Sequence, residues 1–214
     1  EAEEGEEVCF LHGEVLDRDG NFYNANYRSA KAQVRYFCRE GRQTWHPLLT
    51  FFGFRYIKLE RFPGEIRTEQ FCAIAVYSAM RQTETLHCGV SEINQLVSNI
   101  LWRQRGNFLD VPTDCPQRDE RLGWTGDAQV FIKAASYNYD VEKFFRKWLH
   151  DVAAEQRADG AVGQVVPDYL PDNAPSAAWG DAAIICPWQL YLSYGDTQIL
   201  DEQFDCMRRW VEYI

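Results

Sequence analysis

The hydrophobic pattern of this 214-residue chain changes its period at about residue 88, and this change constrains the fold most strongly. Before it, short runs rich in β-branched and aromatic residues (34–38, 48–59 and 71–77) alternate with turn signals. After it, apolar residues recur at helical spacing. Strands followed by helices predict two domains in series. We therefore expect a partial β-sandwich-type domain at 1–87 and a helical domain at 88–214.

Five helices are expected in the second part, and the links between them alternate in length. The first is expected to have Ser91 as its N-cap, the second to be capped near Thr125, and the third to be capped by Asp140. The links at 106–124 and 159–180 are long, and the other two are short. Links that follow odd-numbered helices of an antiparallel stack emerge at one end. The two long links should therefore share one rim of an α/α barrel.

The first long link concentrates charged and aromatic side chains in the run RGNFLDVPTDCPQRDERLGWTGDAQ. A solvated loop is a weak alternative, because a tryptophan on such a loop would expose apolar area. Glycoside hydrolysis uses this set: one carboxylic acid protonates the leaving oxygen, and a second carboxylate activates water or attacks the sugar. Arginines favour the ionised form of the acid that they contact. The residue types alone therefore leave open whether Asp114, Asp119, Glu120 or Asp127 is the proton donor.

Within this link, DCPQRDERLGWTGDAQ resembles the signature of the bacterial α-L-rhamnosidases of glycoside hydrolase family 78. The segments GEVLDRDGNFYNANYRSA, FFGFRYIKLERFPG and AAWGDAAIICPWQLYLSYGD resemble further parts of that family. The resemblance implies a β-sandwich fragment followed by the first helices of an (α/α)6 barrel. It also implies inverting release of terminal α-L-rhamnose, with Glu120 as general acid. The implied rhamnose-binding residues are Asp114, Arg118, Trp124, Asp127 and Trp179.

Structural roles are the alternatives for several of these residues. Trp179 could serve the core, and Asp114 and Asp127 could be helix caps or loop ion pairs. The resemblance also implies a general base from a later part of the barrel, and no position here matches it. We therefore expect a fragment that is inactive alone. Another inverting α/α-barrel glycosidase, or an inactive sugar-binding fragment, are the alternative functions.

The formal charge of −10 disfavours nucleic acid and anionic membranes as partners. A rhamnose-containing glycoside, the partner that the resemblance implies, is compatible with this charge. Seven cysteines are scattered without a C-x-x-C pair, which argues against a disulfide framework and a zinc site. We expect no metal and no cofactor. The cysteine pattern favours a reducing compartment, so a cytoplasmic location is expected over a secreted one.

Overall fold

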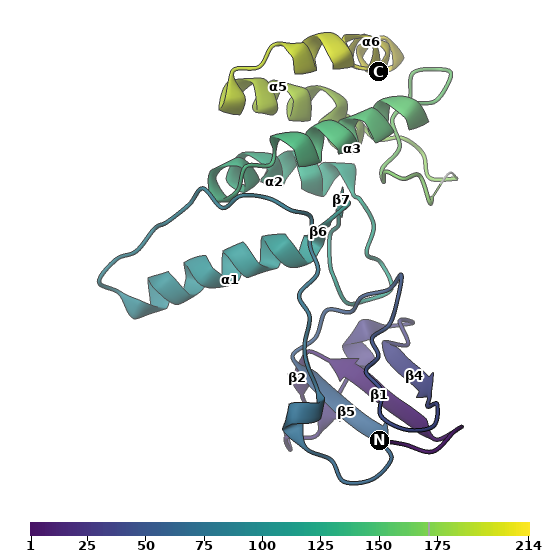
Figure 1. Cartoon of the computed structure of the whole chain (residues 1–214). Helices are drawn as coiled ribbons and strands as arrows, with labels where there is room; N and C mark the ends of the chain where they lie inside the picture. Colours follow the sequence, from purple (N-terminus) through teal and green to yellow (C-terminus); the bar gives the residue numbers. More distant parts are fainter. Residues whose placement is uncertain (171) are drawn as a thin grey trace. The chain divides into compact units, whose positions relative to one another are not determined.

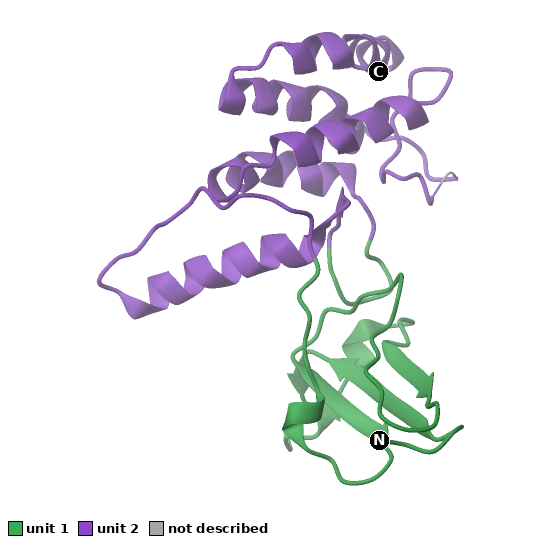
Figure 2. Ribbon diagram, viewed as in Figure 1, with its two compact units in different colours: residues 1–76, 115–121 green, residues 77–114, 122–214 purple. Residues whose placement is uncertain are grey.

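A computed structural model describes residues 1–170 and 172–214, and it contains two compact units (Figure 2). The first, called the β unit below, consists of residues 1–76 and 115–121. The second, called the helical unit, consists of residues 77–114 and 122–214. A short piece of the first long link, 115–121, therefore packs with the strands that precede it in the sequence.

A three-stranded antiparallel sheet with the order β4-β1-β5 forms the centre of the β unit (Figure 1). Its strands are β1 (Glu7–Gly13), β4 (Gln33–Phe37) and β5 (Tyr56–Arg61). A two-stranded ribbon, β2 (Val15–Leu16) with β3 (Phe22–Tyr23), and two short 3-10 turns, Ala25–Tyr27 and Thr68–Gln70, complete it. On the central strand, Phe10 lies opposite Val34 on one side and Leu59 on the other.

The strand predictions for the β unit are confirmed only in part. The run 34–38 forms β4, and the end of the run 48–59 lies in β5. The run 71–77 is not a strand, so that prediction is wrong. Ile74 is 64% exposed and Val76 53% exposed, and no strand among the described residues pairs with them. Apolar character alone does not make a strand without a neighbour to bond.

His12 on β1 is a buried histidine in the core of the β unit. Its ring stacks on Phe52 with centroids 4.2 Å apart, and its Nδ1 lies 2.9 Å from the carbonyl oxygen of Ala32. Burial lowers the pKa of His12 below its ordinary value of 6.5, and the hydrogen bond to Ala32 opposes this only in part. The fold therefore holds this histidine in its neutral form.

We expect the free energy of unfolding to fall as the pH drops below about 6.5, because the unfolded chain then takes up a proton at His12 before the folded chain does. His12→Gln keeps a donor for Ala32 without a titrating ring, and it should remove this part of the pH dependence. Denaturant titrations above and below that pH measure the effect. His46→Gln, at an exposed histidine, is the control and should leave the dependence unchanged. Identical curves for the two variants would contradict the expectation.

The helical unit is a stack of helices around an aromatic core (Figure 1). Its elements are α1 (Ser91–Asn107), β6 (Phe108–Leu109), β7 (Val111–Pro112), α2 (Thr125–Asn138), α3 (Glu142–Glu155), α4 (Ala177–Gly180), α5 (Ala182–Tyr194) and α6 (Gln198–Tyr213). Phe145, Trp148 and Leu149 on α3 are fully buried, as are Leu190 on α5 and Trp210 on α6. Pro187 lies inside α5, and Gly195 ends that helix with φ = 72°.

The predicted N-caps are wrong, because each side chain has another partner. Ser91 is already the first residue of α1, and its hydroxyl donates to the adjacent carboxylate. Thr125 begins α2, and its hydroxyl donates to the carbonyl oxygen of Gln164 at 3.0 Å. Asp140 lies before α3, where its carboxylate forms an ion pair with Arg81 at 3.3 Å. The helices begin close to the expected positions without these cap bonds.

The predicted sharing of one rim by the two long links is confirmed by hydrogen bonds within the helical unit. Trp124 forms an isolated β-bridge with Val165, which joins the first long link to the second. The short turns meet at the other end, where the N–H of Val141 donates to the hydroxyl of Tyr194 at 2.9 Å. The helices therefore alternate in direction.

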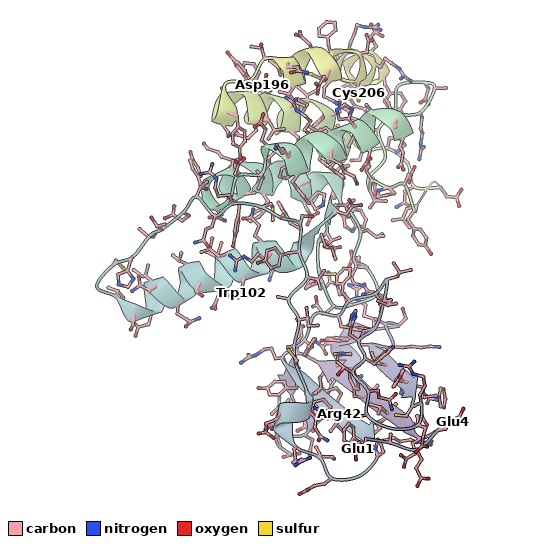
Figure 3. All side chains as sticks on the ribbon, in the orientation of Figure 1. Glu1, Glu4, Arg42, Trp102, Asp196 and Cys206 are labelled. Carbon is pink, nitrogen blue, oxygen red and sulfur yellow. The ribbon has the colours of Figure 1, made fainter. Side chains whose placement is uncertain are left out.

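Several apolar side chains on the helices are not covered in the described part of the chain. On α6, Phe204 is 62% exposed and Val211 57% exposed, although Trp210 between them is fully buried. On α1, Trp102 is 54% exposed (Figure 3). No described helix is both long and apolar enough to span a membrane.

Candidate active site

Asp114 and Leu122 of the helical unit join the two ends of the loop that carries the acidic cluster. The N–H of Asp114 donates to the carbonyl oxygen of Leu122 at 3.1 Å, and the N–H of Leu122 donates to Oδ1 of Asp114 at 3.0 Å. This reciprocal pair closes residues 115–121 into a loop. Asp114 therefore has a structural role, whatever it also does for a ligand.

Gly53 anchors the first limb of this loop to the β unit. Its N–H donates to the carbonyl oxygen of Pro116 at 3.0 Å, and its own carbonyl oxygen accepts from the hydroxyl of the buried Tyr27 at 2.6 Å. A Cβ atom at Gly53 would lie 2.9 Å from Cγ of Pro116. Glycine is needed here because any side chain would push the loop away.

Two further bonds fix the middle and the second limb of the loop. The side-chain amide of Gln117 donates to the carboxylate of Glu14 at 3.0 Å. The guanidinium of Arg121 donates to the carbonyl oxygen of Phe51 at 3.2 Å and lies over the Phe51 ring. Arg121 thus binds a backbone carbonyl group and an aromatic ring of the β unit.

Glu120 receives two guanidinium groups on the same carboxylate oxygen. Arg28 and Arg118 each place an Nη2 atom 2.9 Å from its Oε2. The neighbouring Asp119 accepts from the hydroxyl of Ser29 at 2.6 Å and lies 3.7 Å from Nε of Arg28. Two consecutive residues of the β unit, Arg28 and Ser29, therefore bind two consecutive acids of the loop.

Ser29 is the main influence on the acid next to Glu120. Its hydrogen bond lowers the pKa of Asp119, and the Arg28 charge adds to that shift. Asp119 therefore accepts hydrogen bonds as a carboxylate. This role anchors the loop to the β unit and does not fit a proton donor.

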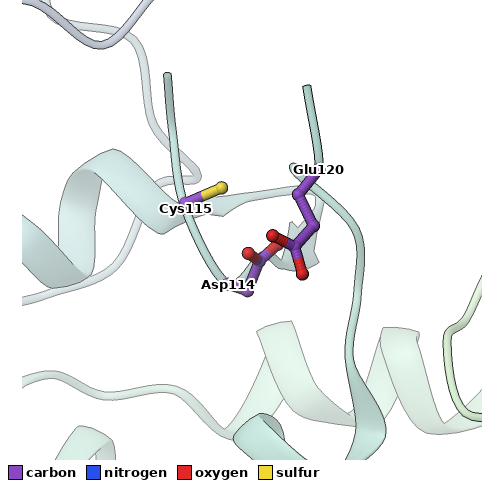
Figure 4. A group of neighbouring side chains, drawn as sticks. All are labelled: Asp114, Cys115 and Glu120. Carbon is purple, nitrogen blue, oxygen red and sulfur yellow. The ribbon is translucent and has the colours of Figure 1, made fainter. Parts of the chain in front are cut away.

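Cys115 and Glu120 lie on the two limbs of the loop (Figure 4). Cys115 is buried, and its Sγ accepts from the N–H of Arg121 at 3.4 Å. A buried thiol with such a contact packs the loop and does not act as a nucleophile.

Within the helical unit, Trp179 lies against the start of α2. A Cβ atom at Gly126 would be 2.9 Å from its Nε1, so the indole packs directly on this glycine. Asp127, the next residue, is exposed in the first turn of α2. Trp124 immediately precedes the helix. Both indole N–H groups, of Trp124 and Trp179, are enclosed without an acceptor among the described residues.

The predicted site residues thus form two local groups. Arg118 and Glu120 meet in the loop that packs with the β unit, and Trp179 meets the start of α2 that bears Asp127. Sequence reasoning missed Arg28 and Ser29. Arg28 lies 92 positions from Glu120, and no short motif around it indicates such a pairing.

Both units match models of one protein family. Residues 81–214 match the bacterial alpha-L-rhamnosidase 6 hairpin glycosidase domain, and residues 1–77 match the bacterial alpha-L-rhamnosidase concanavalin-like domain. The chain is therefore a concanavalin-like β domain followed by helices of a six-hairpin domain, as the expected fold class required.

Individual proteins agree with these matches. An alpha-L-rhamnosidase of Formosa agariphila is 42% identical over 212 residues, which is 98% of this chain and 23% of that protein. The solved structure of the Streptomyces avermitilis alpha-L-rhamnosidase complexed with L-rhamnose superposes with a TM-score of 0.93 at 42% identity, over 99% of this chain and 21% of that one. The solved structure of the alpha-L-rhamnosidase of Dictyoglumus thermophilum superposes with a TM-score of 0.93 at 35% identity. The superposition covers 99% of this chain and 24% of that one. The chain thus spans under a quarter of the length of these relatives.

Proposed function

This chain belongs to the bacterial α-L-rhamnosidase family, and on that premise we propose that it supplies the general acid of an enzyme that releases terminal α-L-rhamnose with inversion. Glu120 is the proposed acid. The observation that carries this assignment is its carboxyl group, whose Oε2 is bound by two arginines while Oε1 takes no part in those contacts. The two guanidinium groups fix the direction of this carboxyl group, and they would stabilise the negative charge that forms on it when its proton leaves.

The proposed step balances as follows. The proton on Glu120 passes to the glycosidic oxygen, the bond between that oxygen and the anomeric carbon breaks, and its electron pair stays on the leaving oxygen. Water adds to the anomeric carbon from the opposite face and gives its proton to a second carboxylate. In inverting enzymes the two carboxyl groups stand about 6.5–9.5 Å apart. We assign this base to no residue of this chain, so residues 1–214 alone should be inactive.

Rhamnose is proposed to lie against Trp124 and Trp179, with Asp114, Arg118 and Asp127 as polar contacts. Buried donors without acceptors are uncommon in folded proteins. The two unpaired indole N–H groups therefore support a binding role, because a ligand hydroxyl or a water molecule would satisfy them after a small movement. Trp179 is only partly buried, which favours a wall of the sugar site over a place in the core.

Gly126→Ala should weaken rhamnose binding without removing any proposed contact residue. The added methyl group would collide with the Trp179 indole and displace it. Titration calorimetry with rhamnose on the full-length enzyme measures the effect, which we expect to be about 3- to 30-fold in Kd, since misplaced packing costs roughly 1 kcal/mol or more.

Gly106→Ala is the matched control for this prediction. Gly106 also lies in a helix, but nothing lies within 4 Å of an added Cβ. This change should leave the Kd unaltered and slightly stabilise the protein, because alanine is the better helix former. Equal affinities for both variants would remove Trp179 from the sugar site.

The direct test of the proposed function uses the full-length enzyme and a panel of aryl glycosides. Proton NMR during the first turnovers should show β-L-rhamnose from an aryl α-L-rhamnoside, which marks inversion. Release of α-L-rhamnose first would refute inversion. Faster cleavage of another glycoside would refute the substrate and favour a different glycosidase on the same fold.

A further inference from the structure

We propose that Arg28 of the β unit is a positioning residue for the general acid: it holds one oxygen of Glu120 and stabilises the carboxylate that forms when the proton leaves. This inference rests on the proposed role of Glu120. Arg28 and Glu120 both belong to the β unit, and Arg28 lies in the concanavalin-like part of the chain.

The geometry separates Arg28 from an ordinary surface ion pair. Its Nη2 lies 2.9 Å from Oε2 of Glu120, the same oxygen that Arg118 binds. The acid's side chain is only 25% exposed. A guanidinium on one oxygen restrains rotation of the carboxyl group, so the other oxygen keeps a defined direction. Fixed donors of this kind act where negative charge develops in the transition state.

The backbone at Arg28 is strained, which folding alone does not explain. Its φ of 56° and ψ of −117° belong to a region that glycine occupies readily and other residues avoid. The Arg28 side chain is 52% exposed, and half-exposed ion pairs add little to stability. An arginine at a glycine position therefore costs folding free energy without an equal return, and strain of this kind concentrates at functional sites.

Neighbouring contacts fix the base of the Arg28 side chain. Its N–H bonds to the carbonyl oxygen of Ala25 at 3.2 Å, and the adjacent Tyr27 is fully buried with its hydroxyl on Gly53. On the other side, Ser29 binds Asp119 through both its hydroxyl and its N–H. Arg28 thus sits between two anchored residues, as preorganised electrostatic stabilisation requires.

The test measures leaving-group dependence in the full-length enzyme. Arg28→Ala should lower kcat for rhamnosides of unactivated alcohols by about 10- to 100-fold and for a nitrophenyl rhamnoside by less than about threefold, the range of one charged hydrogen bond. In the variant, kcat should therefore depend more steeply on the leaving group, because proton donation matters most when the leaving group is poor. Arg28→Lys should recover part of the lost rate. Added guanidinium ion should do the same for the Arg28→Ala enzyme.

Arg28→Gly separates function from folding. Glycine relieves the backbone strain, so this variant should melt no lower than the wild type and should still show the steep leaving-group dependence. Arg18→Ala is the control, since Arg18 is an exposed arginine of the same unit. It should leave kcat, KM and the leaving-group dependence unchanged.

The outcomes distinguish this inference from the proposed function. Suppose that Glu120→Gln makes kcat depend more steeply on the leaving group. The positioning role of Arg28 would then be overturned if the Arg28 variants lost the same factor in kcat on every substrate, or lost nothing. If Glu120→Gln leaves the dependence unchanged, the acid assignment itself fails and the role of Arg28 fails with it.

Discussion

Glu120→Gln should lower the rate of the full-length enzyme on rhamnosides with poor leaving groups by about 100- to 10,000-fold, which is the usual contribution of a general acid. Glutamine has nearly the same shape but carries no acidic proton. The leaving oxygen would then depart as an alkoxide. Arg28 and Arg118 would also face a neutral amide in place of a carboxylate.

Steady-state kinetics with a natural disaccharide and a nitrophenyl rhamnoside measure this loss. The nitrophenyl substrate should lose much less, because nitrophenolate leaves without help. Glu65→Gln, at an exposed glutamate of the same unit, is the matched control and should change neither rate. An unchanged rate on the disaccharide would remove Glu120 from the acid role.

The order of the elements was predictable because it depends on local periodicity. Phe144, Phe145, Trp148, Leu149 and Val152 follow helical spacing, and all five are buried in α3. The prediction of a strand at 71–77 failed because a strand needs a hydrogen-bonded neighbour, and the sequence of the segment alone does not determine whether one is present. The predicted cap at Ser91 failed for a similar reason, since its hydroxyl bonds to a neighbouring side chain.

The site was predictable only where its residues are close in sequence. Glu120 and Arg118 stand two positions apart, and their contact follows from the loop they share. The contact of Arg28 with Glu120 depends on how residues 115–121 pack with the much earlier residues of the β unit, and that packing is not encoded near either residue. Gly53 makes that docking possible through its close approach to Pro116, a role that one glycine in a sequence does not reveal.

Trp148 on α3 joins the core of the helical unit to its rim. Its side chain is fully buried, with its ring edge-on to Phe145 at 6.0 Å. Its indole N–H donates to the carbonyl oxygen of Val166 at 3.2 Å, and the N–H of Val166 donates to Gly123 at 2.9 Å. Trp148 therefore connects the core to the segment next to Trp124.

Trp148→Ala should destabilise the chain by about 3–5 kcal/mol, the usual cost of removing a buried aromatic ring. The loss also leaves the Val166 carbonyl oxygen without its indole donor, and Trp148→Phe, which keeps most of the ring volume, should isolate that smaller part. Urea unfolding of residues 1–214, followed by circular dichroism, measures both changes. Trp188→Ala is the control: Trp188 is 50% exposed on α5, and such surface changes usually stay within about 0.5 kcal/mol. If both alanine variants unfold at the same urea concentration, Trp148 does not contribute more to stability than the exposed Trp188. The hydrogen bonds between the two long loops would then hold the rim without it.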